Sequence, residues 1–226
     1  MPKLLNATQL KLIAIISMLI DHIGMVLYPD VYVLRIIGRL AFPIFAFLII
    51  EGYYHTSNFS KYLMRITIFA LLSQIPFTLA TWRLVFYYKE LNVYFTFVIA
   101  LLMIYLIERC RQIELKSLIF IASILIVYFL NSQYNVYGML MIFSFYYFRN
   151  NDKLKIISIT VINIAMAFLT TGGNVKYVQL AAPLALIFIY LYNGQRGKGM
   201  KYFFYVFYPL HFLVLFFIKV VLFAGI

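Results

Sequence analysis

The chain has 226 residues, of which 65% are hydrophobic and 12% are charged, and its mean hydropathy is +0.95. Soluble domains average about 45 to 50% apolar and about 25% charged residues, so the composition excludes a soluble protein and predicts one embedded in a membrane. The net charge of +12 arises from cations in short loops between apolar runs. This clustering favours membrane orientation over nucleic-acid binding.

Apolar runs of membrane length predict one all-α domain, residues 1–226, built as a polytopic bundle of about nine transmembrane helices. The first run holds Asp21 and His22 and has no small-residue cleavage site, so we expect a retained span and not a signal peptide. The stretch from Thr81 to Leu91 is typical of an interfacial segment with aromatic anchors. In chain order, the predicted spans are 9–28, 35–54, 59–80, 92–108, 115–131, 135–149, 154–170, 176–192 and 201–222.

Basic residues gather in alternate connections. Thirteen of the 19 lysines and arginines fall at the N-terminus or in the loops near residues 61–65, 109–116, 149–155 and 196–201. Because positively charged loops stay on the cytoplasmic side, we expect a cytoplasmic N-terminus and, with nine spans, a C-terminus outside.

Ionisable side chains inside a span cost about 2.5 to 3.5 kcal/mol on insertion scales and mark candidate sites. Lys11 and His22 are eleven residues apart, which places them within about 20° of one helix face and about 16 Å apart along the axis. Such a face suits a ligand with an anionic head at the surface and a reactive tail inside, the shape of acetyl-CoA. The alternative is that Lys11 is an interfacial anchor and His22 a packing residue.

Other polar residues in the spans favour structural pairing. Asp21 points about 100° away from His22, and we favour a clamp with Arg35 or Arg39 over a catalytic role for the aspartate. Glu51 and His55 lie one helical turn apart, and we expect Arg65 on the third span to reach them. These residues form either a structural ion pair or part of a site.

Near the end of the chain, Tyr208, Pro209 and His211 are predicted to interrupt the ninth span and to place an imidazole near the middle of the membrane. We favour a functional role for His211. The single Cys110 excludes an internal disulfide and a cysteine-based metal cluster, and no zinc-spaced histidine pair is present, so we expect no metal site.

Several long strings carry a family resemblance that spans nearly the whole chain. They are LNATQLKLIAIISMLIDHIG at 5–24, RIIGRLAFPIFAFLIIEGYYHTSNFSKYLMR at 35–65, SQIPF at 73–77, LNVYFT at 91–96, YGMLMI at 137–142, YNGQRG at 192–197 and KYFFYVFYPLHFLVL at 201–215. On these strings the chain resembles the TraX family of integral membrane acetyltransferases, which implies acetyl transfer from acetyl-CoA to an amine such as a pilin N-terminus and leaves the acceptor open. The spacing of Lys11 and His22 is also similar to a basic residue and histidine pattern in acyltransferase-3 proteins.

These observations predict a multi-pass acetyltransferase of a bacterial cytoplasmic membrane, with membrane lipid, acetyl-CoA and a peptide, protein or glycan acceptor as partners. His22 or His211 would be the general base, and Asp21 is a weaker catalytic candidate. The alternatives are a small transporter or ion- or proton-conducting protein that uses the same polar residues, and a structural membrane chaperone. The candidates for coenzyme binding are Lys11, Lys61, Arg65, Arg196 and Lys198, and those for structure or substrate binding are Arg35, Arg39, Glu51, His55 and Tyr208.

Overall fold

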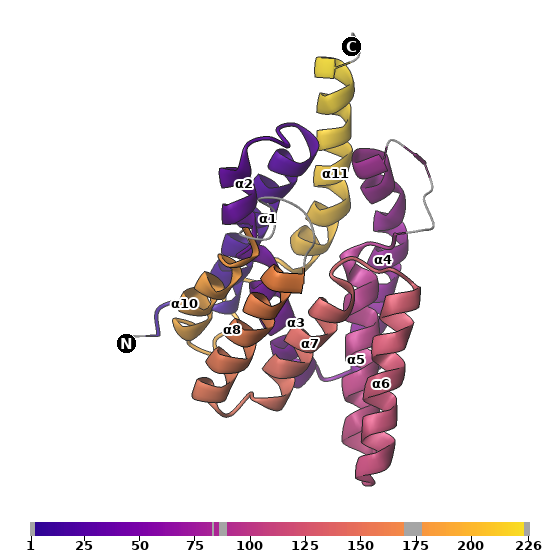
Figure 1. Cartoon of the computed structure of the whole chain (residues 1–226), viewed down its shortest axis with the longest axis vertical. Coiled ribbons are helices and arrows are strands. Elements are labelled where there is room, and N and C mark those ends of the chain that lie inside the picture. The colour runs from indigo at the N-terminus through magenta and orange to yellow at the C-terminus, as the bar shows by residue number, and fades with distance from the viewer. Residues whose placement is uncertain (1–2, 83, 86–89, 170–177, 224–226) are drawn as a thin grey trace.

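The protein is described by a computed structural model that covers residues 3–82, 84–85, 90–169 and 178–223 (Figure 1). Within these ranges it is a bundle of helices, and the extended pairing found there consists of two isolated bridges, Leu5 with Tyr192 and Leu91 with Ser132. The described elements are α1 (Ala7–Val26), α2 (Tyr32–Gly38), α3 (Ala41–His55), α4 (Phe59–Trp82), α5 (Val93–Arg109), α6 (Ile113–Phe129), α7 (Asn135–Tyr147), α8 (Asp152–Leu169), the 3₁₀ turn η1 (Ala182–Leu184), α10 (Ala185–Tyr190) and α11 (Lys201–Phe223).

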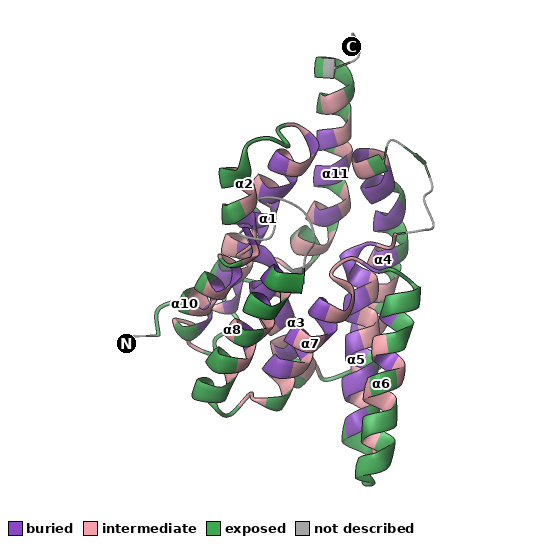
Figure 2. Cartoon of the chain, viewed as in Figure 1, coloured by how far each residue is buried: buried purple, intermediate pink, exposed green. Residues whose placement is uncertain are grey.

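The helices carry their apolar side chains outward as well as inward. Four segments are long and apolar enough to cross a membrane, namely 7–26, 32–55, 59–82 and 202–222. Large hydrophobic residues such as Ile68, Leu71 and Leu72 on α4 are exposed. Figure 2 shows exposed stretches along outer helices, α6 among them. An exposed apolar surface of this kind suits contact with lipid, and helices satisfy their own backbone hydrogen bonds there.

The two ends of the bundle are defined by contacts between segments far apart in sequence. At one end, which we call the basic end, Leu5 pairs with Tyr192, and the α3 terminus meets those of α5 and α7. At the opposite end, Leu91 pairs with Ser132, and Phe42 stacks on Tyr134 with 3.8 Å between ring centroids. The basic end therefore gathers the N-terminus and the loops at 110–112, 148–151 and 191–200, and the chain alternates between the two ends as the sequence predicts.

Helix α1 begins at a capping box. The Asn6 side chain accepts a hydrogen bond from the Gln9 backbone N–H at 3.0 Å, and the Gln9 side chain accepts one from the Asn6 N–H at 2.9 Å. These two bonds satisfy donors that a helix N-terminus otherwise leaves free. From this start α1 packs on α2, α3 and α11, so its two sides face different parts of the bundle.

Three predicted spans, the second, the eighth and the ninth, differ from the structure in detail. The second is divided at Arg39 and Leu40 into α2 and α3, and Arg35 on α2 and Arg39 at the turn both reach Asp21 on α1. The described part of the eighth, residues 178–192, is not one helix but is divided into η1 and the six-residue α10, with Pro183 in η1, because proline interrupts a continuous helix. The ninth is not interrupted, since α11 continues through Pro209 from Lys201 to Phe223. Most of the predicted interfacial segment between Thr81 and Leu91 and the start of the eighth span lie outside the described residues.

Candidate active site

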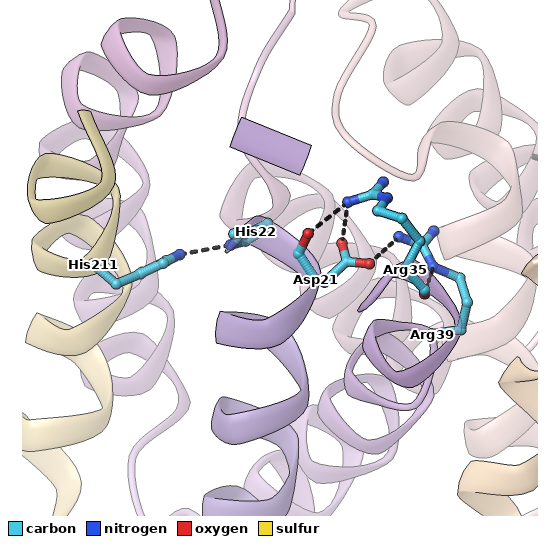
Figure 3. A network of polar contacts seen from close by, with 5 residues as sticks. All are labelled: Asp21, His22, Arg35, Arg39 and His211. Carbon is cyan, nitrogen blue, oxygen red and sulfur yellow. Dashed lines mark hydrogen bonds and ion pairs between the residues drawn. The ribbon is translucent and has the colours of Figure 1, made fainter. Parts of the chain in front are cut away.

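Two histidines that are 189 positions apart meet inside the bundle. His22 Nδ1 on α1 lies 2.6 Å from His211 Nε2 on α11, and the two rings are nearly parallel, with an interplanar angle of 10° (Figure 3). Their exposed fractions are 6% and 5%. Phe212 lies against both rings. The contact is a buried hydrogen bond between two titratable groups.

The hydrogen-bond partners of this pair determine which nitrogen carries each proton. His211 Nδ1 lies 3.0 Å from the Phe207 carbonyl oxygen, which can only accept, so Nδ1 is the protonated nitrogen of His211. The Nε2 of a neutral His211 then accepts from His22, and His22 Nδ1 must donate. The remaining nitrogen of a neutral His22, Nε2, is therefore unprotonated, and its lone pair has no hydrogen-bond donor among the residues that the structure describes. His22 is the member of the pair that can take a proton from a ligand, and His211 orients it.

The neighbouring Asp21 is engaged by two arginines. Arg35 Nη1 donates to Asp21 Oδ2 at 2.8 Å, and Arg39 Nη2 donates to Oδ1 at 2.7 Å. Arg35 Nη1 also donates to the Asp21 backbone carbonyl at 2.9 Å. The predicted pairing of Asp21 with an arginine is thus present and involves both arginines. Because both carboxylate oxygens are occupied and Figure 3 shows Asp21 directed away from the histidine pair, the contact favours the clamp.

The clamp depends on a close approach between α1 and α2. A Cβ added at Gly38 would collide with the Asp21 side chain, and one added at Gly24 would lie 2.8 Å from Leu34 Cβ. Glycine at these positions lets the two helices come close enough for the arginines to reach the carboxylate. The clamp therefore fixes α1 in the bundle at the level of His22.

The cations proposed for coenzyme binding lie nearer the basic end. Lys11 Nζ is 5.4 Å from the centroid of Phe204, so α1 and α11 contact each other there as well as at the histidines. On α4, Arg65 lies beside the Tyr205 hydroxyl and 5.9 Å from the Tyr62 ring, and its Nε is buried with no hydrogen-bond partner in the described part of the chain. Such an unsatisfied buried donor is unusual.

The loop that carries Arg196 and Lys198 is attached to the beginning of α1. The Thr8 hydroxyl contacts the backbone carbonyls of Arg196 at 3.0 Å and Lys198 at 2.7 Å. Gly197 adopts a left-handed φ of 71°, and a Cβ there would collide with Asn6. Both basic side chains are exposed, as is Lys61 on α4. The loop thus lies near Lys11, whereas Lys61 belongs to the same helix as Arg65.

The expected contact of Arg65 with Glu51 and His55 is wrong. Glu51 lies 3.8 Å from His55 Nδ1, as the spacing predicts, but its cationic partner is Arg149, with 3.7 Å between Nε and Oε1. The reason is that α3 packs on α7, whose following turn carries Arg149, and Arg65 faces α11. Burial and the Glu51 carboxylate raise the pKa of Tyr192 in this cluster to about 12, so that this tyrosine remains neutral. The cluster at the basic end is distant in the bundle from the histidine pair and has the character of an interhelical ion pair.

His22 also lines a cavity of about 30 Å³. Tyr208, a predicted site residue, lies on its wall, and so do Gln133 and Tyr134, which sequence reasoning missed. A polar residue in the loop between two predicted spans was the available signal for Gln133. In the part of the chain that the structure describes, no group of three or more His, Cys, Asp or Glu residues forms a cluster able to hold a metal ion.

Comparison with known proteins gives a family and two relatives. Residues 6–219 match the statistical model of the family described as "TraX protein". The chain is 30% identical to "Probable fimbrial assembly protein FimC, serogroup H1" of Dichelobacter nodosus, over 93% of this chain and 94% of that protein. It is 44% identical to "Uncharacterized protein RP591" of Rickettsia prowazekii (strain Madrid E), over 31% of this chain and 26% of that protein. No solved structure matches the chain significantly.

Proposed function

The chain belongs to the TraX family, and on that premise we propose that it is a membrane-embedded acetyltransferase. It would move an acetyl group from cytoplasmic acetyl-CoA to an amine or hydroxyl acceptor at or beyond the membrane. The observation that carries the proposal is the buried pair of His22 and His211, whose hydrogen bonds leave His22 Nε2 as a free base. A positioned base is what acyl transfer to an amine or hydroxyl needs, and it contributes typically 10² to 10⁴ in rate.

In this mechanism the coenzyme supplies an activated thioester. His22 Nε2 takes the proton from the acceptor as its nitrogen or oxygen forms a bond with the acetyl carbon. The carbon–sulfur bond breaks, and the proton passes to the departing sulfur. His211 holds His22 in the tautomer that this step requires and accepts from its Nδ1–H when the ring becomes positively charged. The Phe207 carbonyl on α11 accepts from His211 Nδ1 and so fixes the tautomer of His211, which in turn fixes that of His22.

The basic residues fit an anionic coenzyme. Lys11 contacts an aromatic ring and, among the described residues, has no carboxylate within ion-pairing distance, while Arg65 retains an unsatisfied buried Nε. Lys11 and His22 are separated by about 16 Å along α1, a distance suited to an extended pantetheine arm. Lys11 and Arg65 would therefore hold the phosphates, with Arg196, Lys198 and Lys61 contributing positive charge at the surface.

The relative named as a fimbrial assembly protein favours a pilin-like N-terminus as the acceptor. The test is mass spectrometry of membrane proteins, peptides and glycans from cells with and without this protein, and with His22→Ala in its place. We expect species heavier by one acetyl group that require both the protein and His22. Purified protein should also bind acetyl-CoA. If it does not bind acetyl-CoA and instead supports ion or solute flux in proteoliposomes, the protein is a transporter and the proposed enzyme activity is wrong.

The cytoplasmic location of the coenzyme end can be tested separately. In a Cys110→Ser background, a cysteine at Lys153 or Arg196 should be shielded from impermeant thiol reagents in intact cells, whereas one at Asn135 should react. The reverse labelling pattern would place the basic end outside and contradict access to cytoplasmic acetyl-CoA.

A further inference from the structure

The cavity beside His22 lies between α1, α3, α5, α11 and the loop at 130–134. Its wall is mainly apolar and includes Met18, Phe42, Val93 and Phe97. Met18 and His22 are four residues apart on α1, so they share one face of that helix. The proposed base is therefore next to a small apolar compartment, which the proposed reaction has so far not used.

His22 contributes to the wall of this cavity, while its Nδ1 is already occupied by His211. The free Nε2 is consequently the nitrogen that can act on a group held in the cavity. A transferred carbonyl carbon must come close to the acceptor atom that this nitrogen deprotonates. A cavity lined by the residue that carries the proposed base is a candidate position for the acyl group during transfer.

The polar part of the wall offers hydrogen-bond donors. The Tyr208 hydroxyl is directed at Gln133 Oε1, 3.4 Å away, which leaves the Gln133 amide N–H groups as donors. Donors fixed near a carbonyl oxygen stabilise the negative charge that develops there during acyl transfer. Gln133 and Tyr208 are held by different elements, the 130–134 loop and α11, so their positions are set by the folded bundle.

The volume limits what the cavity can accept. A water-sized group needs about 10 to 15 Å³ of such space, so about 30 Å³ holds two or three of them. An acetyl group has three non-hydrogen atoms, and each additional methylene would need further room. Resting on the proposed function, we propose that this cavity receives the acyl group during transfer, with Gln133 at its carbonyl oxygen, and that its size restricts the enzyme to acetyl.

The experiment compares acyl donors in one preparation of enzyme. Purified full-length protein is assayed with acetyl-CoA and propionyl-CoA and, as acceptor, a synthetic peptide with a free N-terminal amine. The ratio of the two kcat/KM values is taken, because this ratio cancels differences in the amount of folded enzyme. Met18→Ala shortens a lining side chain one helical turn from His22 and so enlarges the cavity. It should raise the propionyl-to-acetyl ratio of kcat/KM about tenfold or more, since one methylene in a fitted pocket changes discrimination by about 10- to 200-fold. Val93→Ala is a milder second variant.

Met139→Ala is the matched control, because Met139 is fully buried on α7 and does not line the cavity. It should lower stability to a similar degree and leave the ratio unchanged. If the ratio is the same in wild type, Met18→Ala and Val93→Ala while acetyl transfer persists, the cavity is not the acyl site. If the wild type transfers no acetyl group at all, the proposed function itself fails, and the two failures are distinct.

The polar side is tested by Gln133→Leu, which should lower kcat by about 10² and leave the KM for acetyl-CoA and the acyl ratio nearly unchanged. Gln179→Leu is its control. Gln179 Nε2 donates to Tyr137 and Asn163 in a separate polar cluster, so its loss should reduce stability without reducing kcat per folded molecule. Equal kcat for wild type and Gln133→Leu would remove Gln133 from the carbonyl site.

Discussion

Asp21 and His22 are adjacent on α1, yet the bundle treats them in opposite ways. Asp21 faces α2 and α3, where two arginines occupy both of its carboxylate oxygens. His22 faces α11, where one nitrogen is bonded to His211 and the other is left free beside a cavity. Both carboxylate oxygens of Asp21 are bonded to arginines of the protein, whereas His22 keeps one ring nitrogen available.

The difference separates stability from chemistry on a single helix. The ion pairs of Asp21 hold the folded structure together, because removing either partner leaves an uncompensated charge and lowers the stability of the protein. A base must instead keep a lone pair available for the substrate. The clamp on one side of α1 holds the helix so that the base on the other side has a defined position. Variants at the two positions should therefore fail for different reasons.

The largest effect on activity is expected at His22. His22→Ala removes the free base and should lower kcat per folded molecule by about 10² to 10⁴, while acetyl-CoA binding is retained. The measurement is steady-state kinetics on purified protein, with binding of acetyl-CoA measured separately. A His22→Ala enzyme with nearly normal kcat would show that the base lies elsewhere.

The second effect concerns the clamp and should appear in stability. Asp21→Asn leaves two partly buried arginines without their carboxylate and should destabilise the protein by about 3 kcal/mol, measured as a loss of melting temperature in detergent. Combination with Arg35→Gln should recover part of this loss, because the double variant buries one unpaired charge fewer.

Gly38→Ala is a useful control for the clamp, since it changes no charge. The added Cβ collides with the Asp21 side chain, so it should also lower the melting temperature. A stable but inactive Asp21→Asn protein would contradict the clamp and move Asp21 into the catalytic group.

The sequence could predict the Asp21 contact because its partners are close along the chain and a charge in lipid requires compensation. Arg35 and Arg39 are 14 and 18 residues away, on the next span. The His22 and His211 contact could not be predicted in the same way, since 189 residues and all the other helices separate them. Each histidine could be selected as a site residue alone, but their pairing depends on α1 packing against α11.

The same limit explains the error at Glu51. Its local partner His55 follows from the spacing of one helical turn, whereas the distant partner depends on whether α3 packs against α4 or α7. Composition and loop charges determine that helices are present and which ends lie together. They do not determine which helices are neighbours, and the cavity residues Gln133 and Tyr134 were missed for that reason.

The third prediction distinguishes the base from the residue that orients it. His211→Leu deprives His22 Nδ1 of its acceptor and removes the preference for one tautomer, so kcat should fall by about 10². His211→Gln places a side-chain oxygen near the position of the lost Nε2, where it can accept from His22 Nδ1, and should restore part of this loss, leaving a defect of about tenfold. If the two variants are equally impaired, His211 acts on the substrate directly and not through His22.

The smallest effect is expected at Lys11, which lies on the same side of α1 as His22 but near the basic end. Because a phosphate anchor binds the ground state and the transition state alike, Lys11→Gln should raise the KM for acetyl-CoA by about tenfold and leave kcat largely intact.

The position of the charge can be tested without changing the net charge. The double change Lys11→Leu with Leu12→Lys rotates the cation by about 100° around the helix, away from Phe204 on α11. This variant should reproduce the KM defect of Lys11→Gln. A normal KM in the shifted variant would mean that a diffuse positive surface binds the coenzyme, and that Lys11 and His22 do not form two ends of one site along α1.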